Sequence, residues 1–128
     1  MNYMIIVTGP PYGTQNAITA FLFSKSVLKL NFNISKIFFY ASGVYNANCM
    51  INLPDNEFNV LNGWISLKKN YNIRLCICPG SAYRRGILSN ESSKKIKKHQ
   101  KIFSSFFRCM TLTELSYSIH TCDRIVQF

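Results

Sequence analysis

The sequence is poor in acidic residues and histidine, and it contains no long apolar run. Five Asp and Glu stand against fifteen Lys and Arg, and there are two histidines. No stretch approaches the roughly 20 apolar residues that a transmembrane helix requires. The segment before Gly9 has neither the basic region nor the cleavage site of a secretory signal peptide. We therefore expect a cytoplasmic protein with no membrane association.

The cysteines do not form a disulfide framework. There are five of them, an odd number, and no spacing repeats as it would in a small secreted domain. In a reducing cytoplasm we expect them to be free thiols. The 128 residues show no internal repeat and no linker, and they are enough to bury a core without a metal or a disulfide. The sequence thus predicts one domain over residues 1–128.

The motifs that bind nucleotides and metals are also missing. Gly9 and Gly13 match neither G-x-x-x-x-G-K-[ST] nor G-x-G-x-x-G, so we expect no nucleotide or other cofactor. Cys76, Cys78, His120 and Cys122 could be grouped as four zinc ligands, but their spacing is not that of a known zinc site, and we expect no metal. The histidines and the few carboxylates form no recognisable hydrolytic triad.

The net charge of +10 has two explanations. An acidic partner such as RNA would be attracted by the basic surface, above all by the five lysines between Lys94 and Lys101. Alternatively, the abundance of Asn, Lys, Ile, Phe and Tyr reflects compositional drift, and the lysines form a solvated helix face. We favour drift and expect no specific direct binding of tRNA.

Short apolar runs alternate with helical patterns along the chain. This alternation predicts a single-domain, three-layer α/β fold with a mostly parallel five-stranded sheet, for which we expect the flavodoxin-like order 2-1-3-4-5. The segment ASGVYNANC after the second strand is expected to be a loop. The predicted strands are 3–8, 35–40, 73–78, 107–110 and 123–128. Three of the predicted helices span 14–30, 79–86 and 90–105. A fourth opens in LPDNEF (53–58), with Phe58, Leu61 and Ile65 as its apolar face. The last follows the capping box TLTE (111–114), with Leu112, Leu115 and Ile119 as its apolar face.

Two cysteines at the end of the third predicted strand differ in their expected roles. Cys76 lies inside the strand, where a cysteine usually acts as a small buried hydrophobe. Cys78 closes the strand just where a helix begins with Pro79, and the positive end of a helix dipole favours a thiolate. Arg84 and Arg85 could add positive potential if the fold directs them back. Cys78 is therefore the candidate nucleophile.

Four segments together resemble the DsrE-like family. They are VTGPPYGTQ (7–15), FFYASGVYNAN (38–48), ICPGSAYRRGI (77–87) and TCDRIVQF (121–128), and the likeness extends from end to end. It implies a sulfurtransferase that carries sulfur as a persulfide on Cys78, without a cofactor, in a relay for 2-thiolation of the wobble uridine of tRNA. Implied partners are a TusA-like donor, a TusE-like acceptor, and TusB-like and TusC-like sibling subunits in a heterohexamer.

Two features depart from the family, and one alternative stays open. Pro79-Gly80 follows Cys78 where relatives have small apolar residues, and Pro79 removes one backbone N–H near the thiol. The segment 90–106 is poorly matched and far more basic. The alternative to a transfer role is a structural subunit of the same type of complex whose cysteine carries no sulfur. The sequence leaves open whether Cys49 shares a cleft with Cys78.

Overall fold

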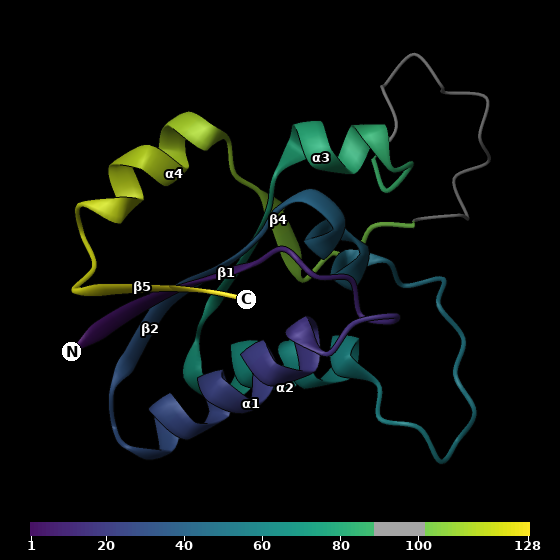
Figure 1. The fold of residues 1–128 in the computed structure, drawn as a ribbon, viewed down its shortest axis with the longest axis horizontal. Coiled ribbons are helices and arrows are strands. Elements are labelled where there is room, and N and C mark those ends of the chain that lie inside the picture. The colour runs from purple at the N-terminus through teal and green to yellow at the C-terminus, as the bar shows by residue number, and fades with distance from the viewer. Residues whose placement is uncertain (89–101) are drawn as a thin grey trace.

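The computed structural model describes residues 1–88 and 102–128, which form a parallel five-stranded sheet between two layers of helices. Figure 1 shows α1 and α2 on one face of the sheet and α4 toward the other, while α3 lies beside η1. The α/β fold with a parallel five-stranded sheet is thereby confirmed. The elements are β1 (Asn2–Val7), α1 (Asn16–Lys29), β2 (Asn33–Phe39), η1 (Ala41–Ala47), α2 (Val60–Tyr71), β3 (Arg74–Ile77), α3 (Pro79–Arg84), β4 (Phe107–Cys109), α4 (Leu112–Ile119) and β5 (Arg124–Gln127).

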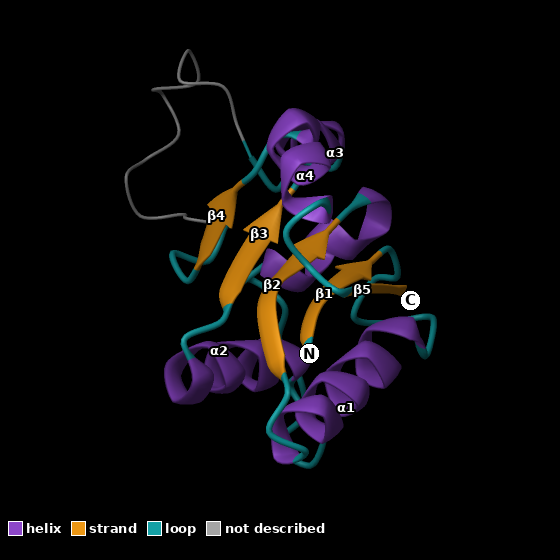
Figure 2. Cartoon of the chain, turned by 90° about the vertical axis from the view of Figure 1, so that its left-hand side faces the viewer, coloured by secondary structure: helices purple, strands orange, loops and turns teal. Residues whose placement is uncertain are grey.

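The strand order differs from the expected 2-1-3-4-5. It is β4-β3-β2-β1-β5, and every neighbouring pair is parallel (Figure 2). The chain steps in one direction from β1 to β4 and then crosses the sheet to place β5 beside β1. Because crossovers between parallel strands are right-handed, α1 and α2 lie on one face, and α4, whose crossover runs the other way, lies on the opposite face. The flavodoxin-like order would require this reversal earlier in the chain.

The main core lies between the sheet and the helices α1 and α2. Trp64 of α2 is fully buried and packs edge-to-face against Phe21 of α1 and Phe39 of β2, with ring centroids 5.5 and 5.3 Å apart. Such aromatic pairs stabilise a core beyond the burial of their area. Among the helices within residues 1–88 and 102–128, we find none with the length and apolar character needed to cross a bilayer.

The helix α2 begins later than the sequence predicts. It starts at Val60, and the side chain of Asn59 caps it by accepting a hydrogen bond from the N–H of Asn62 at 3.1 Å. The predicted opening at LPDNEF is instead a turn, in which the N–H of Glu57 donates to the carbonyl of Pro54. The expected face of Phe58, Leu61 and Ile65 is also wrong. The buried residues of α2 are Val60, Gly63, Trp64 and Leu67.

The segment after β2 is not a loop but a 3-10 helix, η1, that folds over the end of β1. Its buried Asn46 joins three elements, because the side-chain amide donates to the carbonyls of Gly9 at 3.1 Å and Gly43 at 2.8 Å and accepts from the indole N–H of Trp64 at 3.2 Å. These bonds satisfy a polar group that would otherwise be buried without a partner. The loop after β1 is thus fixed to η1 and α2.

The helix predicted for 90–105 and the lysine cluster Lys94–Lys101 fall mostly or wholly outside the described residues. At the end of that region, Phe103 forms an isolated antiparallel bridge with Asn48. The N–H of Ser104 donates to the carbonyl of Ala47 at 2.9 Å. Where the structure describes the end of this segment, it therefore joins the chain after η1 rather than continuing a helix.

Candidate functional site

Cys78 occupies the transition from strand β3 to helix α3. Its N–H donates to the carbonyl of Phe39 at 3.0 Å, which continues the β2–β3 pairing by one residue. Its own carbonyl accepts from the N–H of Ala82 at 3.0 Å, so Cys78 is the N-cap of α3. The residue is 5% exposed. The predicted position of Cys78 at the end of a strand and the start of a helix is confirmed.

Pro79 occupies the first helical position of α3, as predicted. A proline is tolerated there because the N–H it lacks would have no partner within the helix. The helix spans six residues and ends at Arg84, and Gly86 follows with a φ of 70°. Glycine adopts this left-handed conformation without strain, which explains why the helix terminates here.

Cys76 and Cys78 lie on the same side of β3, because side chains alternate along a strand. They belong to a small apolar cluster on the face opposite α1 and α2, which we call the cysteine cluster and which consists of Phe38, Cys76, Cys78 and Met110. Burial raises the pKa of the Cys76 thiol, and the positive charges of Arg108, Lys36, Lys68 and Arg74 oppose that effect. Cys76, which is 1% exposed, therefore remains a neutral packing residue at neutral pH, as predicted.

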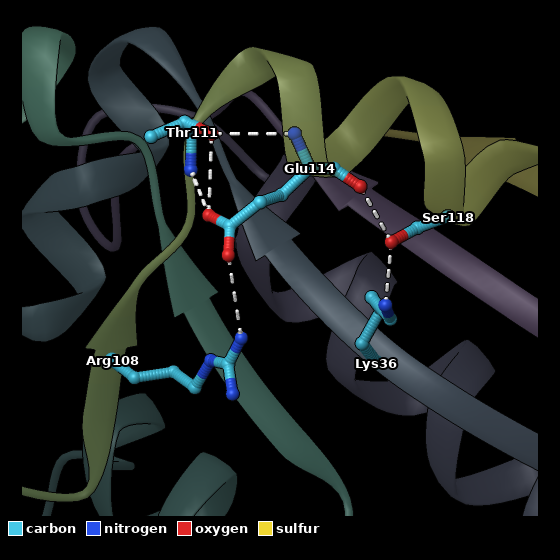
Figure 3. Close-up of polar contacts among 5 residues, drawn as sticks. All are labelled: Lys36, Arg108, Thr111, Glu114 and Ser118. Atoms are coloured by element: carbon cyan, nitrogen blue, oxygen red, sulfur yellow. Dashed lines mark hydrogen bonds and ion pairs between the residues drawn. The ribbon is translucent and has the colours of Figure 1, made fainter.

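Helix α4 covers the cysteine cluster through Leu115, which packs against it. The predicted capping box is confirmed, since Thr111 Oγ1 accepts from the N–H of Glu114 and Glu114 accepts from the N–H of Thr111. Glu114 also pairs with Arg108 of β4 at 3.9 Å, and Lys36 of β2 donates to Ser118 at 2.6 Å (Figure 3). These contacts connect both ends of α4 to the sheet beneath it.

The carboxylate of Glu114 links the stability of the fold to pH through its lowered pKa. Hydrogen bonding from the Thr111 backbone holds the pKa of Glu114 below its ordinary value of 4.5, and the charges of Arg108 and Lys36 contribute in the same direction. A lowered pKa in the folded state means that the stabilisation is present above the unfolded value and disappears as pH falls through the folded value. We expect the free energy of unfolding of Glu114→Gln to vary less with pH below 4.5 than that of the unsubstituted chain.

Urea denaturation at several pH values above and below 4.5 measures this difference. Glu57→Gln serves as the matched control, since Glu57 is also an exposed carboxylate but lies in the turn before α2. A Glu114→Gln variant with the same pH dependence as the unsubstituted chain would contradict the role given to the capping box.

The two arginines after Cys78 point in different directions. Arg85 donates to the carbonyl of Ser81 at 3.2 Å. Arg84 lies on the exposed side of α3, one helical turn from Gly80, and a β-carbon placed on Gly80 would be 3.5 Å from Arg84 Nη1 and 4.0 Å from Cys78 Sγ. The fold therefore brings one of the two guanidinium groups back toward the candidate nucleophile.

Cys109 is a second thiol near Cys78 that the sequence analysis did not identify. It pairs across the sheet with Ile77, the residue before Cys78. Partial burial raises the pKa of Cys109, and the electrostatic effect of Cys78 raises it further. The signal that could have found Cys109 is the pairing of the third strand with the fourth, which the expected order 2-1-3-4-5 already contains, but the register that sets Cys109 beside Ile77 was not predicted.

The other polar candidates do not join this site. Cys49 donates to the carbonyl of Ile102 at 3.2 Å and lines a hollow with Phe103 and Phe106, whereas Cys122 donates to the carbonyl of Ile119 at 3.3 Å. Within residues 1–88 and 102–128, no three His, Cys, Asp or Glu side chains converge as metal ligands would. His99 lies outside the described residues. The chemistry that the site offers is that of the largely buried Cys78 thiol at the edge of the sheet.

Comparison with known proteins gives a match along the entire chain. The model of the DsrE/DsrF-like family matches residues 1–128. Sulfurtransferase TusD of Buchnera aphidicola subsp. Acyrthosiphon pisum (strain 5A) is 46% identical over 130 residues, with both chains covered completely. Sulfurtransferase TusD of Proteus mirabilis (strain HI4320) is 38% identical over 128 residues, which cover 100% of this chain and 98% of that protein. The crystal structure of the ychN protein from E. coli has the same fold, with a TM-score of 0.77 at 18% identity and full coverage of both chains.

Proposed function

We propose that this chain, which belongs to the DsrE/DsrF-like family and is a sulfurtransferase, carries sulfur as a persulfide on Cys78. The observation that carries the proposal is the location of Cys78, which lies at the carboxyl end of a parallel strand as the N-cap of the next helix. Sites in open parallel sheets form beyond the carboxyl ends of the strands. The full-length similarity to proteins named sulfurtransferase TusD supports the same chemistry.

The reaction is two successive exchanges at sulfur. In the first, the Cys78 thiolate attacks the outer sulfur of a donor persulfide, the donor S–S bond breaks, and the products are Cys78–S–SH and the donor thiolate. In the second, an acceptor thiolate attacks the outer sulfur on Cys78, which yields the acceptor persulfide and regenerates the Cys78 thiolate. Both steps follow the rules of thiol–disulfide exchange, in which the thiolate fraction and access set the rate. Neither step needs a cofactor.

The burial of Cys78 suits a relay rather than a free sulfur carrier. A residue that is 5% exposed meets small thiols less often than an exposed residue does, which slows removal of the outer sulfur before an acceptor protein docks. Cys76 cannot replace it, because its raised pKa leaves little thiolate at neutral pH. Sulfur therefore passes through Cys78 alone of the two cysteines in the cluster.

In this proposal the chain acts in the cytoplasm in a relay for 2-thiolation of the wobble uridine in tRNA. It accepts sulfur from a TusA-like donor, passes it to a TusE-like acceptor, and assembles with TusB-like and TusC-like siblings in a heterohexamer. Large apolar side chains exposed on α4 and β5 support assembly, since exposed apolar groups can mark contact sites. These exposed apolar side chains of α4 and β5 are Leu112 (51% exposed), Tyr117 (73%), Ile119 (38%) and Ile125 (41%).

Mass spectrometry of the chain purified from cells tests the proposal. The chain is isolated under non-reducing conditions, together with any subunits that copurify, and its peptides are analysed for one additional sulfur atom. We expect the additional sulfur on the peptide that contains Cys78. If it lies on another cysteine, the assignment is wrong. If no cysteine carries it after incubation with a persulfide donor, the chain is a structural subunit.

A further inference from the structure

Gly80 places no side chain in the space beside the sulfur of Cys78. Its φ is not in the left-handed region, so the backbone does not require glycine there. A β-carbon at this position would make only ordinary contacts, at 3.5 Å to Arg84 Nη1 and 4.0 Å to Cys78 Sγ. Glycine is a poor helix former compared with alanine. Nothing in the free-thiol form of the site therefore accounts for a glycine at position 80.

The position of the absent β-carbon of Gly80 is one that an outer sulfur on Cys78 could approach. An S–S bond is about 2.05 Å long, so an outer sulfur directed from Cys78 toward the β-carbon point of Gly80 would lie about 2 Å from that point. This separation is far shorter than a non-bonded contact between sulfur and carbon. A methyl group on residue 80 would thus be compatible with the free thiol but would exclude a persulfide in this direction.

Arg84 borders the same space. From the two distances above, its Nη1 atom would lie within about 5.5 Å of the outer sulfur, a gap that a small rotation of a long side chain closes. Its side chain is exposed, and within the described part of the chain it has no hydrogen bond or ion pair that would hold it elsewhere. Arg85 by contrast is engaged with the carbonyl of Ser81. Arg84 is therefore the guanidinium that can meet the sulfur.

We propose that Arg84 binds the outer sulfur of the Cys78 persulfide in the space beside Gly80 and presents it for transfer. This inference rests on the proposed persulfide at Cys78. When the persulfide loses its proton, the outer sulfur carries the negative charge, and a guanidinium forms strong charge-assisted hydrogen bonds with such an anion. For transfer the outer sulfur is protonated, as Cys78–S–SH; the acceptor thiolate attacks it, the S–S bond to Cys78 breaks, and the negative charge of the acceptor thiolate passes to Cys78 Sγ. A cation beside both sulfur positions stabilises this movement of charge.

The experiment uses the full-length chain loaded with glutathione persulfide and compares Arg84→Gln, Arg84→Lys and Arg124→Gln. The loaded chain is treated with iodoacetamide at a series of pH values, and mass spectrometry of its peptides counts those containing Cys78 in which the extra sulfur carries the alkyl group. We expect Arg84→Gln to move the midpoint of alkylation upward by about 0.5–1 pH unit, because a nearby cation favours the anion. The alkylation midpoint of Arg84→Lys should lie close to that of the unsubstituted chain. Arg124→Gln, whose substitution lies on the edge strand β5, should have the same midpoint as the unsubstituted chain.

Gly80→Ala provides an independent measurement. We expect its melting temperature to equal or exceed that of the unsubstituted chain, while the fraction of persulfide falls about tenfold because the methyl group overpacks the space. An unchanged alkylation midpoint in Arg84→Gln, an equal shift in Arg124→Gln, or normal loading of Gly80→Ala would overturn the role of this space. Failure of the unsubstituted chain to load at Cys78 would instead overturn the proposed function, so the two outcomes are distinguishable.

Discussion

Cys78→Ser should abolish sulfur transfer by this chain, whereas Cys76→Ser should leave most of it intact. A serine hydroxyl cannot form a persulfide, and with Cys78 replaced the cysteine cluster retains only the buried Cys76, whose raised pKa disfavours the attacking thiolate. The measurement is transfer of radioactive sulfur from a persulfide donor, through the chain, to an acceptor thiol. We expect no label on Cys78→Ser above that of a chain whose thiols have all been blocked.

Cys76→Ser is a closely matched control. Cys76 and Cys78 are both buried, at 1% and 5% exposure, and both pack in the cysteine cluster, so each variant places one hydroxyl in the same apolar surroundings. That change costs about 1–3 kcal/mol when the hydroxyl lacks a partner, and circular dichroism checks that both variants are folded. Label that persists on Cys78→Ser would refute the assignment, and loss of transfer in both variants with their folds intact would show that Cys76 also takes part.

The positions of Cys76 and Cys78 relative to the sheet could be predicted from the sequence, but the residues that surround them in space could not. Strand alternation and the proline after Cys78 suffice to place Cys76 within the sheet and Cys78 at its edge. The proximity of Cys109 depends on the register of β4 beside β3, and the position of Arg84 depends on the rotamer of a long side chain. Neither is encoded in local spacing, which explains why both were recognised only from the three-dimensional structure.

The difference between local spacing and long-range packing also explains which features of the fold were predicted correctly. The alternation of strands and helices was enough to predict a parallel α/β sheet. The order β4-β3-β2-β1-β5 depends on the direction of each crossover, which is decided by packing between distant segments. The start of α2 was misplaced because LPDNEF and Asn59 offer competing helix-start signals, and burial of Trp64 against Phe21 and Phe39 favours the later one.

Gly43→Ala should destabilise the chain by about 3–5 kcal/mol, a large part of the total stability of a domain of this size. A β-carbon on Gly43 would lie 1.9 Å from the carbonyl oxygen of Val7 and 2.8 Å from its carbonyl carbon. Because the φ of Gly43 is not left-handed, the requirement for glycine comes from space and not from backbone conformation. The Val7 oxygen cannot move freely, since it accepts from the N–H of Tyr40 at 2.9 Å and thereby holds η1 to β1.

Urea denaturation followed by tryptophan fluorescence measures this effect. Trp64 is the single tryptophan, and its indole donates a hydrogen bond to Asn46, which lies in η1 as Gly43 does. The matched control is Ser42→Ala, which changes the neighbouring, partly exposed residue and should alter stability by less than about 0.5 kcal/mol. Equal stabilities for the two variants would mean that η1 can lift away from β1 at little cost. In that case the contact between Gly43 and Val7 would not hold the loops at this edge of the sheet, and the position of η1 beside α3 and Cys78 would need another cause.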